Sequence, residues 1–123
     1  MKHVSIIIPL GHASISHIES TFRILSHVNS ILDDLHNSRL FKIQLVGLDI
    51  PKNNIESRFT AQPDILIKDV KKTELIIIPS IIGDPKNSIA LNQNFIPWIQ
   101  QQHYNGAEVA SFCVGAFLLA ATG

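Results

Sequence analysis

The chain of 123 residues is poor in cysteine and in charge, and both shortages narrow what it can do. Cys113 is the only cysteine, so no disulfide can form within the chain, which is typical of proteins of a reducing cytoplasm. Charged residues make up only 16% of the chain, with ten basic residues against ten acidic ones. Because no basic cluster is present, this chain by itself is a poor candidate for a DNA- or RNA-binding surface.

Several common sequence signatures are also missing. No apolar run approaches the roughly 20 residues of a membrane-spanning helix, and the apolar start at residues 4–10 lacks the cleavage site of a signal peptide. The sequence contains no CxxC or HExxH pattern, and no glycine-rich nucleotide-binding motif follows a predicted strand. We therefore expect a cytoplasmic protein without membrane contact, metal or cofactor.

The hydrophobic residues, 46% of the chain, are arranged in alternating strand-like and helix-like segments. Short β-branched runs predict strands at residues 4–10, 41–48, 75–78 and 109–112. Apolar residues three or four apart predict helices at residues 15–35 and 89–104, and short strands or a hairpin are expected at residues 55–59 and 65–67. This alternation indicates one α/β domain, a flavodoxin-like three-layer sandwich with a parallel sheet and helices on both faces.

The second predicted helix has two notable features. Pro97 is tolerated only near the first turn, so the regular helix should begin around Asn94, and the Asn105-Gly106 pair should end it. Five residues are expected to share its buried face: Leu91, Phe95, Trp98, Ile99 and Gln102. A loop is expected before this helix, at residues 80–86.

The sequence EVASFCVGAFLLAATG, at residues 108–123, is the most informative segment. An apolar strand enters Cys113 and an Ala/Leu-rich helix leaves it, with Ser111 and Gly115 two residues to either side. Small residues at this spacing are typical of a sharp strand-to-helix turn that holds a nucleophile in a strained conformation. Cys113 is therefore the candidate nucleophile, although a lone cysteine is also often a small buried hydrophobic residue.

The carboxyl ends of parallel strands meet at one edge of a sheet, and ligands bind there. These ends are residues 11–14, residues 80–84 and Cys113-Val114. The N–H of Val114 is the natural first oxyanion donor, and the segment containing Ile82 and Gly83 should supply the second. Gly83 is equally well explained as a turn glycine before Asp84-Pro85.

Three further polar residues have both a functional and a simpler interpretation. His12 either pairs with the thiol of Cys113 or is a solvated loop histidine. Asp84 either orients a base or initiates a turn with Pro85. Glu19 is either a displaced acid of the site or an exposed helix charge.

The segments ELIIIPS, at residues 74–80, and PWIQQQHYNGAEVASFCVGAFLLAATG, at residues 97–123, resemble the DJ-1/PfpI (class I glutamine amidotransferase-like) superfamily. The last part is most similar to the N-terminal domain of AraC-type transcriptional regulators. The resemblance implies that residues 1–123 are a DJ-1/PfpI-like domain, truncated at the C-terminus, whose remaining sheet and helix-turn-helix motifs lie outside this chain.

Some features of the superfamily are missing. Where the family usually has Pro-Gly-Gly, this chain has Pro79-Ser80 followed by Ile81-Ile82-Gly83. No acid precedes Glu19 in the region where DJ-1-like enzymes place a glutamate, and the family's later site residue would fall beyond Gly123.

The resemblance implies a ligand-sensing and dimerising domain, binding a small molecule at the Cys113 pocket and contacting DNA only through an attached domain. The alternative is an enzyme of the same superfamily, an amidase or hydrolase, or a glyoxalase/deglycase- or hydratase-like enzyme, with Cys113 as covalent nucleophile. The simplest alternative is a scaffold with an inert cysteine.

Overall fold

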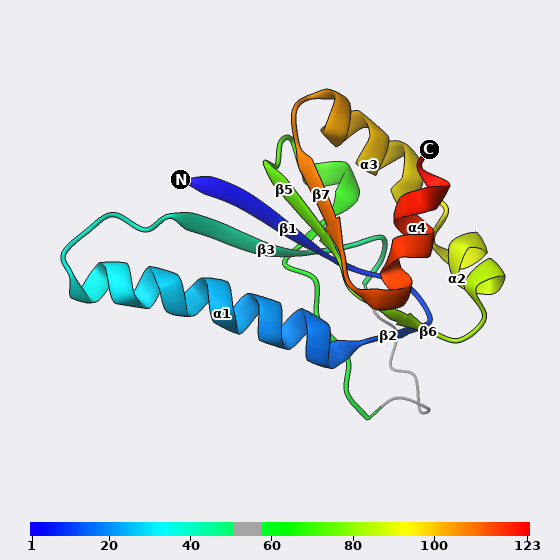
Figure 1. Cartoon of the computed structure of the whole chain (residues 1–123), viewed down its shortest axis with the longest axis horizontal. Helices are drawn as coiled ribbons and strands as arrows, with labels where there is room; N and C mark the ends of the chain where they lie inside the picture. The colour runs from blue at the N-terminus through cyan, green and yellow to red at the C-terminus, as the bar shows by residue number, and fades with distance from the viewer. Residues whose placement is uncertain (51–57) are drawn as a thin grey trace.

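A computed structural model describes residues 1–50 and 58–123 and contains a five-stranded, fully parallel sheet (Figure 1). The strand order is β4-β3-β1-β5-β7. The strands are β1 (Lys2–Ile8), β3 (Phe41–Gly47), β4 (Ile65–Leu66), β5 (Leu75–Ile78) and β7 (Glu108–Ser111). The parallel α/β prediction is thus confirmed. Most of the possible strand at residues 55–59 lies outside the described residues, and Phe59 is not in a strand.

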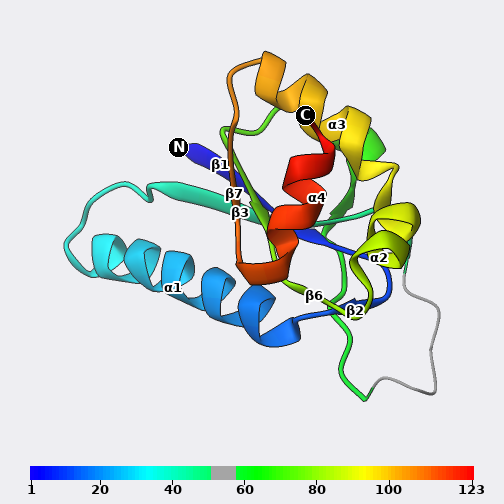
Figure 2. The same ribbon diagram turned by 45° about the vertical axis from the view of Figure 1, so that its right-hand side comes forward.

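Helices cover both faces of this sheet, which gives the three layers expected from the sequence. On one face lies α1 (Ile15–Asp34), and on the other lie α2 (Pro85–Asn92), α3 (Phe95–Tyr104) and α4 (Ala116–Ala121) (Figure 2). The side chains of β1 alternate between these layers: Val4 and Ile6 pack in the α1 core, and Ile7 packs in the core beneath α3 and α4. Strands buried on both faces explain why the apolar runs are nearly continuous in the sequence.

A second, two-stranded sheet joins the loops that follow β1 and β5. In it β2 (His12–Ala13) pairs antiparallel with β6 (Ile81–Ile82), so that His12 lies opposite Ile82. The loops predicted at both places are wrong for these four residues, which form strands. The two strands are too short to leave a periodic pattern, because their pairing depends on the tertiary arrangement of β1 and β5.

The predicted helix at residues 89–104 is in fact two helices, with a break at Gln93-Asn94. Its regular part does begin at Phe95, immediately after Asn94, which places Pro97 in the first turn as expected. The first helix, α2, starts earlier than predicted, at Pro85. Asp84 caps it, since one of its carboxylate oxygens accepts a hydrogen bond from the Asn87 N–H at 3.0 Å.

The break changes which residues are buried. Phe95, Ile99 and Gln102 are buried and Trp98 is partly buried, as predicted, but Leu91 is exposed because α2 does not share the helical phase of α3. The buried residues of α2 are instead Ser88 and Asn92, and Asn92 is buried completely. Its amide accepts a hydrogen bond from the Leu10 N–H at 2.6 Å and donates one to the Leu10 carbonyl at 3.0 Å, so it fixes the loop after β1.

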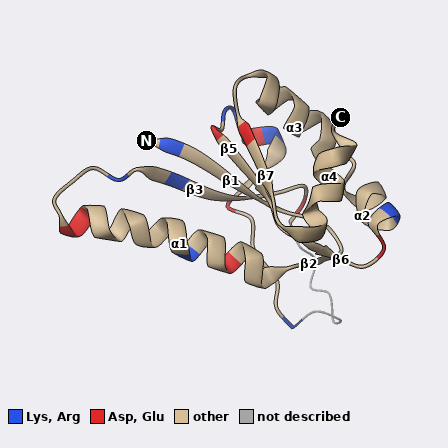
Figure 3. Ribbon diagram, viewed as in Figure 1, with Lys and Arg blue, Asp and Glu red and all other residues tan. Residues whose placement is uncertain are grey.

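Charged side chains are scattered over the elements of the described chain without a basic cluster (Figure 3). No helix within residues 1–50 and 58–123 combines the length and the apolar composition needed to cross a membrane.

Candidate functional site

Cys113 lies at a strained turn between β7 and α4. Its φ is +48°, and His36 is the only other described non-glycine residue with a positive φ. The short helix η2 (Cys113–Gly115) then leads into α4. The predicted strand-to-helix turn is therefore present, and the thiol at its apex is exposed rather than buried in the core.

Gly115 explains why this turn needs a small residue after the cysteine. A Cβ at this position would lie 2.5 Å from the Pro79 carbonyl oxygen and 2.9 Å from the Ile78 carbonyl oxygen. No side chain fits at such distances, so the turn after β7 packs directly against the backbone at the end of β5. The Phe112 N–H, which donates to the Ile78 carbonyl at 2.9 Å, holds the same two segments together.

The predicted oxyanion donors come from the two segments that meet here: Val114 from the turn after β7, and Gly83 from the loop that follows β5 and β6. Val114 follows Cys113 within η2, where it is partly buried. Gly83 has a φ of +118° and, together with Ile82, is exposed beside β6. Their role as donors stays a prediction.

The other predicted site residues have clear positions. His12 is exposed on β2. Asp84 serves as the cap of α2, a role that neither of its two interpretations included. Glu19 forms an ion pair with Arg23 one turn later on the exposed surface of α1, which is the simpler of its two interpretations.

His17, which was not among the predicted site residues, connects the loops around Cys113. Its Nδ1 accepts a hydrogen bond from the Ser80 N–H at 3.2 Å, and its ring lies 5.3 Å from that of Phe112, the residue before Cys113. Because Nδ1 is the acceptor, the neutral ring carries its proton on Nε2. Its position in the first turn of the helix after β1 was the available signal, since that turn faces the ends of the neighbouring strands.

Ser80 is the residue on which these contacts converge. Its carbonyl accepts a hydrogen bond from the Ser14 N–H at 2.8 Å, while its N–H donates to His17. The loop after β1, the first turn of α1 and the loop after β5 are thereby held as one unit. The ring of Phe112 packs against His17 of this unit. Movement of one of the joined loops would therefore change the packing of Phe112, the residue before Cys113.

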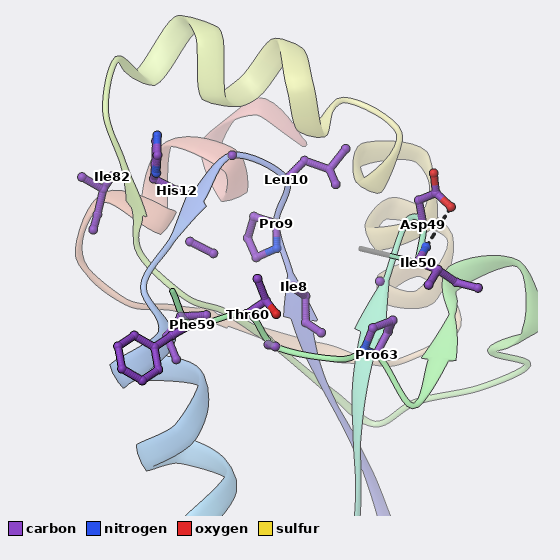
Figure 4. A pocket seen from close by; sticks show the side chains of 15 residues that line it. Ile8, Pro9, Leu10, His12, Asp49, Ile50, Phe59, Thr60, Pro63 and Ile82 are labelled. Carbon is purple, nitrogen blue, oxygen red and sulfur yellow. Dashed lines mark hydrogen bonds between the residues drawn. The ribbon is translucent and has the colours of Figure 1, made fainter. Parts of the chain in front are cut away.

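A cavity of about 470 Å³ opens at the same edge of the sheet, between the ends of β1 and β3 (Figure 4). Its described lining consists of residues 8–13, Ile15, Gly47, Asp49, Ile50, residues 59–61, Pro63 and Ile82. His12 lines it, but Cys113 does not. The cavity and the thiol are therefore separate features. Within the described part of the chain, no three His, Cys, Asp or Glu side chains are grouped as metal ligands would be.

The fold and the strained cysteine turn together define a flavodoxin-like α/β protein with a nucleophile-elbow geometry. No protein-family model matches the chain, and no curated protein sequence matches it either. Solved structures do match. A candidate transcriptional regulator from Vibrio parahaemolyticus has a TM-score of 0.77 and 22% identity over 100% of this chain.

Two further solved structures are DJ-1-type proteins. A two-domain protein from Anabaena variabilis, with DJ-1/ThiJ/PfpI-like and ferritin-like domains, has a TM-score of 0.62 and 18% identity over 99% of this chain. A ThiJ/PfpI family protein from Pseudomonas syringae has a TM-score of 0.64 and 10% identity over 98% of this chain. The chain therefore has the fold of the DJ-1/ThiJ/PfpI superfamily.

These three structures are all longer than this chain. It spans 62% of the Vibrio protein, 32% of the Anabaena protein and 46% of the Pseudomonas protein.

Proposed function

We propose that this chain is the ligand-sensing and dimerising part of an AraC-type transcriptional regulator. The observation that carries the proposal is the similarity of the whole chain to the candidate regulator from Vibrio parahaemolyticus, at a TM-score of 0.77. The segment around Cys113, which resembles such regulators in sequence, supports the same role.

In the proposed mechanism, a change at the carboxyl edge of the sheet biases an attached DNA-binding domain. Either a small molecule occupies this edge, or hydrogen peroxide oxidises the Cys113 thiol to sulfenic acid and is itself reduced to water. The joined loops support this mechanism: Ser80, His17 and Phe112 form consecutive contacts from the loop after β5 to the residue before Cys113. A change on either side would thus alter the packing of the other.

The test uses the complete gene product and the DNA upstream of its own gene. We expect a homodimer by analytical ultracentrifugation and specific binding of the upstream DNA in a gel-shift assay. We further expect peroxide to change the DNA affinity of the wild type but not of Cys113→Ser. If the complete product has no DNA-binding domain, or binds this DNA no better than unrelated DNA, the proposal is wrong.

One observation favours an enzyme as the second candidate. The thiol of Cys113 is exposed at a turn with a φ of +48°, which is the arrangement of a covalent nucleophile. An enzyme would turn over many equivalents of an amide, ester or aldehyde substrate and would lose this activity completely in Cys113→Ser. A regulator would respond to at most one equivalent of ligand or oxidant per site.

A further inference from the structure

We propose that the cavity between the ends of β1 and β3 is a binding site for a small, largely apolar molecule that carries an amino group. The inference deepens the proposed function by naming a ligand class. It depends on that function only for the effect on DNA and not for binding itself. The site is also distinct from the thiol, because Cys113 is not among the residues that line it.

The size and the lining of the cavity fit a small organic ligand. Its volume of about 470 Å³ lies within the range of roughly 300–1,000 Å³ that is usual for such sites. Most of its lining is apolar, including Ile8, Pro9, Ala61 and Pro63. Burial of apolar ligand surface against these side chains would supply most of the binding free energy.

One wall of the cavity is held firmly in place. The loop after β1 contributes residues 8–13 to the lining, and the buried Asn92 side chain holds its backbone at Leu10 with two hydrogen bonds. The β2–β6 pairing fixes the same loop on its other side, through His12 and Ile82. A preformed wall of this kind lowers the ordering cost of binding.

The charge at the cavity selects the ligand class. Among the residues that the structure describes, Asp49 is the only lining residue that carries a formal charge at neutral pH with histidine neutral. A backbone hydrogen bond from Ile50 to its Oδ1, at 2.8 Å, holds the carboxylate at one end of the site. Figure 4 shows His12 and Ile82 at the opposite end, with Pro9 and Thr60 between. An ammonium group near Asp49 would therefore be attracted, and a carboxylate would be repelled.

The position of the cavity would allow ligand binding to affect the residues around Cys113. Ile82 lines the cavity and belongs to β6, which begins directly after Ser80, the partner of His17. Movement of β6 on binding would change the His17 contact and, through it, the packing of Phe112 next to Cys113.

The test is a titration of the ¹⁵N-labelled protein, followed by amide chemical shifts, with 2-phenylethylamine and its anionic counterpart 3-phenylpropionate. We expect saturable shifts at the cavity walls, with the amine bound about threefold or more tightly than the acid, as an exposed charge pair allows. Asp49→Asn should remove this preference. Asp69→Asn, an exposed acid that does not line the cavity, should leave it intact.

A second variant tests the apolar wall. Ile82 is 63% exposed and lines the cavity, whereas Ile24 on α1 is 65% exposed and does not. Ile82→Ala should weaken both probes by about threefold, because apolar contact is lost, while Ile24→Ala should change neither. Absence of saturable binding by the folded wild type would overturn the inference, as would a preference for the acid or a preference that survives in Asp49→Asn.

The outcomes also separate this inference from the proposed function. Amine binding at the cavity without any DNA binding by the complete gene product would support the site and contradict the regulator. A DNA response with no shifts at the cavity walls would support the regulator and contradict the site.

Discussion

At the scale of single residues, Cys113 is the most strained position near the site. A side chain in the left-handed region costs about 1–2 kcal/mol relative to the usual backbone conformations, and the φ of Cys113 is +48°. The adjoining turn must also fit against the carbonyl oxygens of Ile78 and Pro79. The backbone of the turn at Cys113 is thus held in its strained conformation by close packing against the end of β5.

This strain predicts an unusual order of stability for two variants of Cys113. Because glycine adopts a positive φ without cost, Cys113→Gly should be about 1 kcal/mol more stable than Cys113→Ala in urea unfolding. The same pair of residues compared at Ala120, an exposed position in α4, should give the opposite order by about 1 kcal/mol. A more stable alanine variant at both positions would show that Cys113 is not strained.

Gly115 makes the second prediction at this scale. Gly115→Ala should destabilise the protein by about 3 kcal/mol or more, because the new Cβ would overlap the Pro79 carbonyl oxygen, 2.5 Å away. Gly106→Ala is the control. Gly106 has a φ of +100° with nothing near its Cβ position, so this change should cost only about 1 kcal/mol. Equal losses in thermal unfolding would argue against the close backbone contact.

At the scale of elements, the carboxyl edge depends on short contacts that join α1 to the loops after β5 and β7. His17 provides two of them, the hydrogen bond from Ser80 and the ring contact with Phe112. No other described ring contact links α1 to the segment next to Cys113. His17 should therefore influence both the stability of this edge and the accessibility of the thiol.

Two substitutions separate the two contacts of His17. His17→Phe keeps an aromatic ring beside Phe112 but removes the acceptor, so it should cost about 1 kcal/mol of stability. His17→Ala removes both contacts, should cost more, and should speed the reaction of Cys113 with iodoacetamide because Phe112 loses its neighbour. Labelling rates that stay the same as in the wild type in both variants would show that His17 does not constrain the thiol.

The opposite edge of the sheet has a pH-sensitive link between β1 and β5. The Glu74 carboxylate accepts a hydrogen bond from the His3 N–H at 2.7 Å, and this bond is the main reason why the pKa of Glu74 is lowered. Since folding favours the ionised form, this link contributes stability above the ordinary pKa of a glutamate. The contribution is lost as the pH falls through the lowered pKa.

Glu74→Gln tests this link. The wild type should be more stable than the variant near neutral pH, and the difference should shrink as the pH falls from about 5 to about 3. Glu108→Gln at the neighbouring strand start controls for the loss of one acid. A difference in unfolding midpoint that is constant with pH would contradict the assigned role of the His3 hydrogen bond.

At the scale of the whole molecule, the sequence predicts the layers better than it predicts the site. The strand at residues 75–78 was predicted with its bounds, because a continuous β-branched run has no other stable place than the centre of a parallel sheet. The turn at Cys113 was predicted from local spacing, since its strain is a local property. The start of α2 was missed because Asp84 was interpreted as a base-orienting residue or as part of a turn with Pro85, although it caps a helix that begins at Pro85.

The missed parts of the site have a common physical reason. His17, the β2–β6 pair and the cavity at Asp49 all arise where segments distant in sequence meet. Neither hydrophobic periodicity nor a local sequence motif predicts contacts between segments that are distant in sequence. The roles of His12 and Asp84 were ambiguous for the same reason, and the structure places the first at the cavity and the second at the cap of α2.

We propose that events at the carboxyl edge of this sheet control DNA binding rather than catalyse a reaction. The most direct test is the affinity of the complete gene product for the DNA upstream of its gene, measured by fluorescence anisotropy with and without peroxide, for the wild type and Cys113→Ser. We expect specific DNA binding that peroxide changes in the wild type but not in the variant. Absence of specific DNA binding, together with multiple-turnover, Cys113-dependent consumption of a substrate, would contradict it.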